Sequence, residues 1–457
     1  MPIERLTAED RLMLWPDAVW PQDIGALAVL DGRKLFTAEG TFRLDSVREV
    51  VAGRLHLVPR LRQLVHVPPE RLGGPLWVDA PAFDISQHVL VASIPAPGGE
   101  AELLEATEQI RRRRLDRARP LWEMWFLTGL AQGRVGMFVR THHAIADGIA
   151  GVATLAAFLD FDETAVAAIP RPWTPQPPPT EAELLAARRG ERRAALRKAA
   201  GSFAHPLASI RSGMAAWPAL RELLLEAQPV TTSVDRIVGP SRALALVRTD
   251  FDAVRNVAHG FDVKVNDVLL ACVGGGIRRL LTSRSERVDG LVMPVYVPVS
   301  LRHGQYEGAR GNDIAQMVVP VPIGTADPAR RLLLIAAETT LRKARVRPPL
   351  GKLPNRGLAG RLMLKLMDRH RVNVTTADLP GSPIPLYMAG ARVLEMFPLL
   401  PLIARVSLGV GALSYAGRFA VMAVADGDGY PDLDVFASGF IDDFRTLERK
   451  LPLSSAA

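Results

Sequence analysis

The residues whose types and spacing suggest chemistry lie in the stretch RTHHAIADGIAG, from Arg140 to Gly151. His142 and His143 are adjacent, and Asp147 and Gly148 complete the spacing HHxxxDG. At average residue usage, four fixed positions of this kind occur by chance in on the order of one in a thousand such chains. Three interpretations are open for the histidines: general acid–base catalysis, metal binding, or burial in a turn.

A zinc site here would need a second group of ligands. His143 and Asp147 are four residues apart, the spacing at which a helix presents two ligands to one ion. The other histidines stand alone, and the single cysteine, Cys272, forms no Cys/His cluster. The chain also lacks the G-x-S-x-G turn of a serine nucleophile. We therefore expect no metal and no covalent triad, and interpret the pair as the site of a histidine base, which takes a proton from a bound hydroxyl, amine or thiol and returns it.

Hydrophobic periodicity predicts the elements that must position the motif. Residues 135–140 alternate as an interior strand does, and residues 149–159 have apolar side chains at helical spacing, with Asp147 placed to cap that helix. The two histidines are thus expected on a strand-to-helix turn. A strand over 24–30 and a helix with its apolar face at 47–55 precede them, and the arginine run 111–114 is expected to be a solvated helix end.

At 457 residues the chain is longer than one hydrophobic core supports, so two domains are expected. The proline-rich stretch IPRPWTPQPPPT forbids a regular element and suggests an extended spacer, and a basic helix containing Arg188 to Lys198 follows it. A strand-and-helix pattern restarts near residue 242, and a longer helix begins near Asn266. We predict an α/β fold with an N-terminal domain at 1–165, a linker at 166–238 and a C-terminal domain at 239–457.

Composition and charge limit the classes of partner that the protein is expected to bind. The formal net charge is +8, but no basic run is interleaved with aromatic residues, so nucleic acid is not expected. The start MPIERLTAEDRLMLW carries acids where a signal peptide needs a cationic end, which predicts a cytoplasmic protein. Pro398, Pro401 and Arg405 interrupt the longest apolar run, so it is not a membrane span. The basic helix is interpreted either as a solvated bridge or as a segment resting on an anionic membrane.

HHxxxDG resembles the signature of the coenzyme A-dependent acyltransferase superfamily, which includes chloramphenicol acetyltransferase and the condensation domains of nonribosomal peptide synthetases. Within it, the chain resembles the bacterial wax ester synthase/diacylglycerol acyltransferase family over nearly its full length. The resemblance rests on PLWEMWFLTGL, VNDVLLACVGGGIRRLL, VPVSLR, GNDIAQMVVPVP and PLYMAGARVLEMFPLLPL followed by LSYAGRF, in this order and spacing.

The resemblance implies two chloramphenicol acetyltransferase-like domains related by a pseudo-twofold axis, with an active-site tunnel at their interface. It implies catalysis by His143 with His142 as its neighbour, a structural Asp147, a turn at Gly148, and no cofactor apart from acyl-CoA as co-substrate. Asn266 is carried over as a candidate oxyanion donor, although a helix-capping role explains it equally well. The candidate substrate-binding residues are Pro120, Leu121, Trp122 and Asp267, of which Trp122 is better interpreted as core packing.

The chain departs from the family at one loop. Where the family carries Thr/Ser-Asn-Val-Pro-Gly-Pro, this chain reads TTADLPGS, with Asp378 at the asparagine and Ser382 at the final proline. An ionised carboxylate cannot donate the hydrogen bond of the amide that it replaces.

The sequence therefore predicts an O-acyltransferase that moves a fatty acyl group from acyl-CoA to diacylglycerol or a long-chain alcohol, with no covalent intermediate. It is expected at the inner face of the membrane or on lipid inclusions. Two alternatives stay open: a condensation-type enzyme that takes its donor from a carrier protein, and a non-catalytic lipid-surface protein with a decayed acyltransferase fold.

Overall fold

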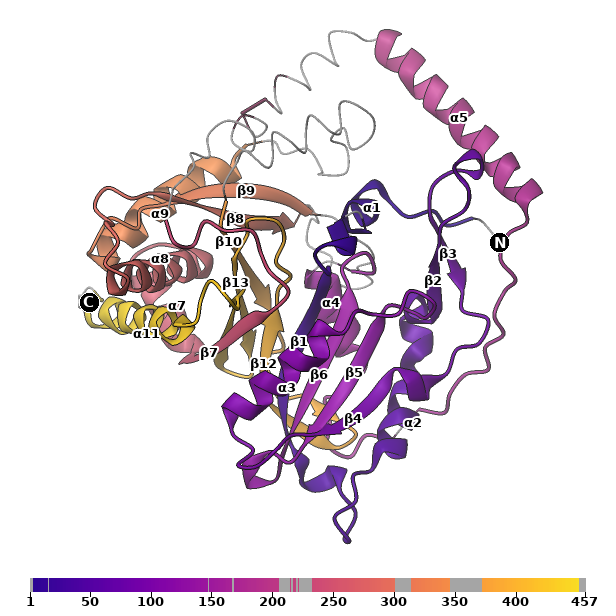
Figure 1. The fold of residues 1–457 in the computed structure, drawn as a ribbon, viewed down its shortest axis with the longest axis horizontal. Coiled ribbons are helices and arrows are strands. Elements are labelled where there is room, and N and C mark those ends of the chain that lie inside the picture. Colours follow the sequence, from indigo (N-terminus) through magenta and orange to yellow (C-terminus); the bar gives the residue numbers. More distant parts are fainter. Residues whose placement is uncertain are drawn as a thin grey trace, which may run out of the picture.

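Two six-stranded β-sheets form the frame of the protein, one built mainly from each half of the chain (Figure 1). The structure is a computed structural model, and it describes residues 3–14, 16–146, 148–166, 168–204, 214, 217, 218, 221, 232–300, 314–345 and 372–451. The α/β class expected from the sequence is confirmed.

The first sheet has the strand order β11-β12-β1-β6-β5-β4. Its strands are β1 (Asp23–Asp31), β4 (Val89–Ser93), β5 (Trp122–Thr128), β6 (Arg134–His142), β11 (Tyr387–Met388) and β12 (Ala391–Leu399). β6 lies between β1 and β5 and is antiparallel to both, with Asp23 opposite His142 and Trp122 opposite Thr141. The interior strand expected before the histidines is therefore present, and it ends at His142.

Helices α2 (Leu44–Arg54) and α4 (Gly148–Ala156) share one core with the first sheet. Val47, Val50 and Val51 of α2 are buried there, as their spacing predicts. Burying an aliphatic side chain of this size contributes about 1.5–3 kcal/mol. Helix α3 (Glu100–Arg112) packs through Leu103 and Ile110 into a different core, which also contains strand residues of both sheets.

Short elements complete the N-terminal half. They are α1 (Ala8–Leu14) and the two-stranded sheet of β2 (Gln63–His66) and β3 (Leu76–Asp79).

The second sheet has the order β7-β14-β13-β10-β8-β9. Its strands are β7 (Arg242–Asp250), β8 (Met293–Ser300), β9 (Ile314–Val321), β10 (Val374–Pro380), β13 (Leu408–Tyr415) and β14 (Arg418–Asp426). The hairpin between β13 and β14 turns through Ala416 and Gly417 at φ values of 46° and 79°. Positive φ at both central residues matches a two-residue hairpin turn, and it favours glycine at the second position.

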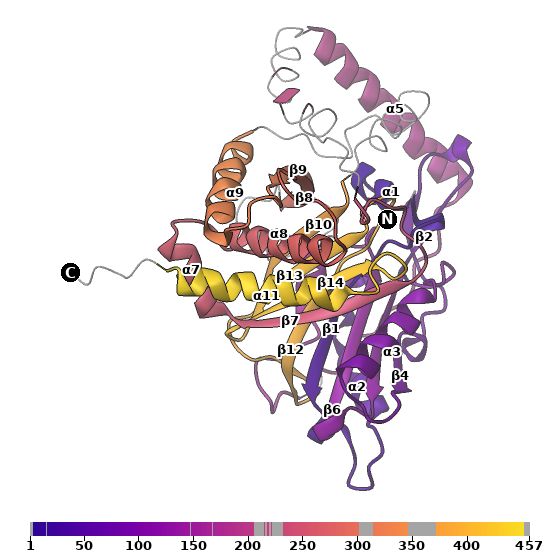
Figure 2. The same ribbon diagram turned by 60° about the vertical axis from the view of Figure 1, so that its left-hand side comes forward.

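Helices α7 (Phe251–Gly260), α8 (Val265–Ser283), α9 (Pro328–Lys343) and α11 (Leu433–Arg449) pack on one face of the second sheet (Figure 2). The other face packs on the first sheet, where Leu27 and Phe138 share a core with Leu244 and Met422. The glycines of α8 permit close helix packing, since a β-carbon on Gly276 would lie 2.7 Å from Phe436 of α11. This agrees with the packing role expected for the GGG run.

The sheets do not follow the predicted order of domains along the chain. Strands β11 and β12 belong to the predicted C-terminal domain 239–457, yet β12 pairs with β1 and extends the first sheet. The run at 391–399 is buried at most positions, and its last four residues are all buried, so its pattern does not indicate which sheet it joins. The boundaries 1–165, 166–238 and 239–457 therefore describe sequence order rather than sheet membership.

The basic helix expected in the linker is present as α5 (Glu181–Ala204), and it projects beyond both sheets (Figures 1 and 2). Leu184 is buried against Leu72 and Leu76, whereas residues 189–197 are exposed. Within the described part of the chain, we find no helix with the length and apolar character needed to cross a bilayer.

One expectation about charge was wrong. In the run 111–114, Arg112 to Arg114 are exposed as predicted, but Arg111 is buried. It pairs with Glu108 one turn earlier, at 2.7 Å, and donates to the carbonyl of Pro240 at 2.9 Å. A paired carboxylate and a carbonyl acceptor offset the cost of removing this guanidinium from water.

Candidate active site

The two histidines stand where β6 leaves the first sheet. His142 is the last residue of the strand, and its amide donates to the carbonyl of Leu121 at 2.9 Å. His143 begins the turn, and its amide donates to the carbonyl of Gln22 at 2.7 Å. The chain reverses there, because the amide of Ile145 donates back to His142 at 2.9 Å. The predicted strand-to-helix turn is confirmed, with α4 beginning at Gly148.

The ring of His142 is buried, and each of its two nitrogens faces a polar group of the protein. The backbone amide of Ala144 donates to Nδ1 at 3.0 Å, so Nδ1 acts as an acceptor and the proton lies on Nε2. Nε2 faces Oδ1 of Asp17 at 3.2 Å, an electrostatic contact that lacks full hydrogen-bond geometry. His142 therefore has no nitrogen available to accept a substrate proton. His143, by contrast, is only half-buried.

Asp17, in the loop before β1, connects that loop to the turn after β6 that carries the histidines. Its Oδ1 accepts from the amide of Gln22 at 3.1 Å, and its Oδ2 pairs with Arg117 at 2.6 Å. Burial raises the pKa of Asp17, but the contacts with His142 and Arg117 outweigh burial and hold the pKa below its usual range. Asp17 is thus a carboxylate in the native protein.

A buried ion cluster lies beneath the histidines. Arg140, 1% exposed, donates to Glu123 at 2.8 Å and contacts Asp23 at 3.3 Å. Burial raises the pKa of Asp23 to about 6 despite the opposing charge of Arg140. Sequence reasoning identified neither this cluster nor Asp17, because residues more than 100 positions apart meet here without any shared spacing.

The Pro-Leu-Trp motif lies directly beside His142. Pro120, Leu121 and Trp122 are all buried, and the carbonyl of Leu121 supports the amide of His142. The indole of Trp122 donates to Leu61 at 2.7 Å and stacks on His88 at 4.7 Å between ring centroids. The packing interpretation of Trp122 agrees with these contacts, while a substrate contact for the motif stays a prediction.

The remaining positions of HHxxxDG give less detail. Asp147 lies outside the described residues, so its predicted structural role stays a prediction. Gly148 is the first residue of α4.

Asn266 and Asp267 lie in the helical layer of the second sheet. Lys264 is the N-cap residue of α8, and the carboxylate of Asp267, three residues later, accepts from its amide at 3.0 Å and from the hydroxyl of Thr339 at 2.7 Å. Capping therefore does not explain Asn266. Its Nδ2 atom is buried without a hydrogen-bond partner in the described structure, as expected of a group that meets water or a ligand.

The segment TTADLPGS, which departs from the family's pattern, lies mostly within strand β10 and not in a loop. Asp378 lies within β10, opposite Ala412 of β13, and β10 contacts α4 of the histidine motif. Burial raises the pKa of Asp378 to about 6, and Lys343 only partly opposes this. Ser382 follows the strand, where its hydroxyl donates to the carbonyl of Ile384 at 2.8 Å.

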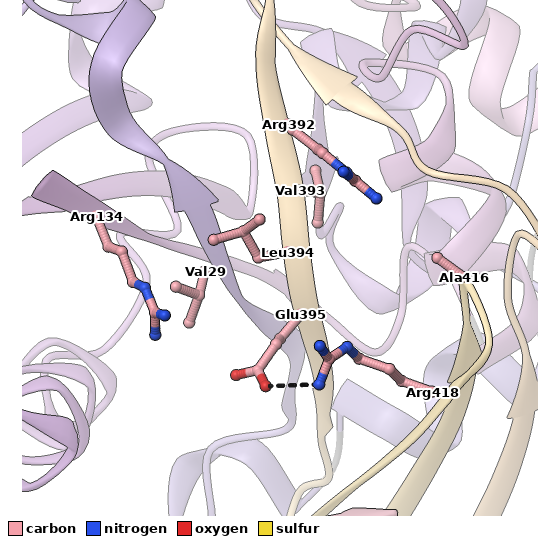
Figure 3. A pocket seen from close by; sticks show the side chains of 8 residues that line it. All are labelled: Val29, Arg134, Arg392, Val393, Leu394, Glu395, Ala416 and Arg418. Carbon is pink, nitrogen blue, oxygen red and sulfur yellow. Dashed lines mark ion pairs between the residues drawn. The ribbon is translucent and has the colours of Figure 1, made fainter. Parts of the chain in front are cut away.

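A cavity of about 240 Å³ lies at the opposite end of β6. In Figure 3 the Glu395 carboxylate and the Arg418 guanidinium point toward one another, 3.7 Å apart. Eight residues line it: Val29, Arg134, Arg392, Val393, Leu394, Glu395, Ala416 and Arg418. Arg134 begins β6 and His142 ends it, so a rise of about 3.3 Å per residue separates them by roughly 26 Å. The cavity is not part of the histidine site.

Two sheet-and-helix halves, with HHxxxDG at the end of an interior strand, define the class of two-domain acyltransferase and condensation folds. A starter condensation domain of rhizomide synthetase RzmA, solved with C8-CoA and Leu-SNAC, aligns over 98% of this chain and 94% of its own, with a TM-score of 0.63 and 13% identity. The wax ester synthase/diacylglycerol acyltransferase from Marinobacter aquaeolei VT8 aligns over 98% and 99%, with a TM-score of 0.67 and 17% identity.

The chain belongs to the wax ester synthase/diacylglycerol acyltransferase family. The model of the family's catalytic domain matches residues 6–269, and that of its C-terminal domain matches residues 310–448. A Mycobacterium tuberculosis (strain H37Rv) protein named as a probable diacylglycerol O-acyltransferase, tgs1, is 31% identical over 430 residues, which cover 92% of this chain and 89% of the relative. The protein is thus an acyl-CoA-dependent O-acyltransferase, as the motifs predicted.

Proposed function

We propose that His143 is the general base that transfers a fatty acyl group from acyl-CoA to the hydroxyl of diacylglycerol or a long-chain alcohol. The observation that carries this proposal is the engagement of His142, whose Nδ1 accepts from Ala144 and whose Nε2–H faces Asp17. These contacts suit a positioning role for His142, and we assign the base to the second histidine of the motif, His143, which begins the turn after β6. Its backbone is held by Gln22, so the ring has a fixed origin at the end of β6.

The reaction needs one proton to move twice. His143 takes the proton of the acceptor hydroxyl while the oxygen attacks the thioester carbonyl carbon. The tetrahedral intermediate collapses with loss of the C–S bond, and the imidazolium gives its proton to the departing thiolate. The products are an ester and free coenzyme A, and no acyl-enzyme forms. Asn266 as the oxyanion donor, and the absence of any metal or further cofactor, stay predictions of this scheme.

The test measures coenzyme A release and ester formation by the purified protein. Radiolabelled acyl-CoA is supplied with a panel of diacylglycerols and long-chain alcohols, and the products are identified by mass spectrometry. His143→Ala should lower kcat by about 10²–10⁴-fold, the range expected for a lost acid–base group. His66→Ala, a change at an exposed histidine, is the matched control and should retain parental activity.

Three results would decide against the proposal. Parental turnover by His143→Ala would remove the base. Ester formation only from acyl groups on a carrier protein, and none from acyl-CoA, would instead support the condensation-type alternative. No ester from any donor and acceptor would support the non-catalytic alternative.

We also propose that the exposed part of α5 attaches the protein to anionic lipid surfaces. Arg189, Arg192, Arg193 and Arg197 are exposed, whereas the only acid in this stretch, Glu191, pairs with Arg5. Each basic side chain near an anionic membrane contributes about 1 kcal/mol, and salt weakens the attraction. The first turns of α5 dock on the N-terminal half through Leu184, which leaves the arginines projecting outward.

Flotation with liposomes tests this attachment. The protein should float with vesicles containing anionic lipid, float less as salt is raised, and not float with neutral vesicles. Arg192, Arg193 and Arg197 changed together to Gln should lose most of the binding. The same change at Arg255, Arg445 and Arg449 alters the net charge equally on other exposed helices, and it should retain binding. Equal binding by both triple variants would contradict the proposal.

A further inference from the structure

The loop before β1 makes contacts that reach both motif histidines. Asp17 faces the His142 ring at 3.2 Å through Oδ1, and the same oxygen accepts from the amide of Gln22 at 3.1 Å. The carbonyl of Gln22 then accepts from the amide of His143 at 2.7 Å. A single carboxylate is therefore one contact from the ring of His142 and two from the backbone of His143.

Asp17 is itself held from the other side. Arg117 pairs with its Oδ2 at 2.6 Å, and Arg114 donates to the carbonyls of Asp17 and Ala18, both at 2.8 Å. The pKa of Asp17 lies below its usual range, so the group keeps its negative charge at neutral pH. A fixed anion beside Nε2–H favours the His142 tautomer in which Nδ1 accepts from Ala144.

We infer that Asp17 is a positioning residue for acyl transfer, acting through His142 and Gln22 to hold the turn that carries His143. Asp17 fixes the tautomer and orientation of His142, and the ring of His142 in turn fixes the amide of Ala144 inside the turn. Gln22 fixes the point from which the His143 side chain projects. The catalytic consequence rests on the proposed role of His143 as base, because misplacing a base by about 1 Å can cost on the order of 100-fold in rate.

Two substitutions at position 17 distinguish the role of the acceptor oxygen from that of the rest of the side chain. Asp17→Asn keeps an oxygen that faces Nε2–H and accepts from the Gln22 amide, and its kcat should stay within about fivefold of the parent. Asp17→Leu has no acceptor, and its kcat should fall by about 10–100-fold with the KM for acyl-CoA unchanged. Asp45→Leu, a change at an acid whose side chain is 93% exposed, is the control and should keep the parental kcat.

Nuclear magnetic resonance of ¹⁵N-labelled histidine gives a readout that a general loss of stability would not move. The parent and Asp17→Asn should show His142 as a single Nε2–H tautomer, and Asp17→Leu should show a mixture. His142→Gln assigns the signal. The tautomer of His142 in the parent protein is measured without any variant at position 17. It therefore tests the contact between Asp17 and His142 even if Asp17→Leu does not fold.

The outcomes separate this inference from the proposed function. An inactive His143→Ala combined with a fully active Asp17→Leu would overturn the positioning role and leave the base in place. A fully active His143→Ala would remove the base, and the catalytic role of Asp17 with it. An Nδ1–H tautomer of His142 in the parent would overturn the inference at its first step.

Discussion

The amide of His143 donates a 2.7 Å hydrogen bond to the carbonyl of Gln22, and this bond joins the turn after β6 to the residue before β1. Both atoms belong to the main chain. Any side chain at position 143 can therefore keep the bond, whereas His142 makes its contacts through its ring. The two histidines should respond differently to the same substitution.

We predict that His142→Ala destabilises the protein much more than His143→Ala. The change at His142 removes a ring that is 2% exposed, leaves the amide of Ala144 without its acceptor, and removes one of the contacts of Asp17. A cavity and unpaired buried groups cost about 2–4 kcal/mol together. His143→Ala removes a ring that is only half-buried and keeps the main-chain bond to Gln22, so it should cost less stability while losing activity. Urea unfolding of both variants measures the difference, and equal losses would contradict the assignment of roles.

Asp378→Asn should stabilise the protein above pH 6. The pKa of Asp378 is raised from 3.8 to about 6 in the folded state, so folding opposes ionisation of this carboxyl. Well below pH 3.8 the group is protonated in both the folded and the unfolded state, and it imposes no penalty. As pH rises through 6 the folded protein loses stability relative to a chain with a neutral amide. The gain from Asn should be about 1–3 kcal/mol at pH 7–8 and should vanish well below pH 3.8.

Unfolding of both proteins between pH 4 and pH 8 measures this difference. The subtraction removes the contribution of Asp23, whose pKa is also raised to about 6 and which both proteins retain. A flat difference for Asp378→Asn would show that this carboxyl is not desolvated in solution.

Much of the site follows from the sequence because local periodicity specifies it. The alternation before His142 and the helical spacing after Gly148 determine the strand, the turn and the helix, and the structure has all three. The same holds for α8, whose predicted start near Asn266 differs from the observed start by one residue. Elements of this kind depend on contacts between residues a few positions apart.

The contacts that sequence reasoning missed are those set by topology. Asp17 and His142 are 125 positions apart and meet only because β1 and β6 are antiparallel neighbours, with Asp23 opposite His142. Arg111 was expected in solvent because its own helix gave no sign that Pro240 would cover it. Strand β12 has a pattern that suits either sheet. In each case the deciding partner lies in a distant part of the chain, which periodicity does not identify.

Gly276→Ala should destabilise the protein although alanine favours helix. A β-carbon at position 276 would lie 2.7 Å from the ring and from the carbonyl of Phe436, so α8 and α11 would have to separate. Overpacking of this kind costs about 1–3 kcal/mol, which exceeds the helix-propensity gain of about 1 kcal/mol. Gly190→Ala on α5 is the matched control, because a β-carbon there meets no atom within 4 Å. Thermal unfolding should show a lower Tm only for the change at 276.

Glu108 belongs to a hydrogen-bond network between the two halves of the chain. Glu108 of α3 accepts from the amide of Arg242 at 2.9 Å and from the guanidinium of Arg111 at 2.7 Å. Glu108→Ala would leave the buried Arg111 without its charge partner, which typically costs about 3–5 kcal/mol. Glu105→Ala, one turn earlier on the exposed face, removes only a bond to Gln109 and should change stability by less than about 0.5 kcal/mol.

Calorimetry distinguishes a local loss from a weakened contact between the halves. Because Glu108 joins α3 to the first residue of β7, its loss should lower the temperature at which the halves separate and split one unfolding transition into two. A single transition shifted by the same amount as in Glu105→Ala would mean that the apolar core between the sheets, formed by residues such as Leu27 and Met422, holds the halves together without this network.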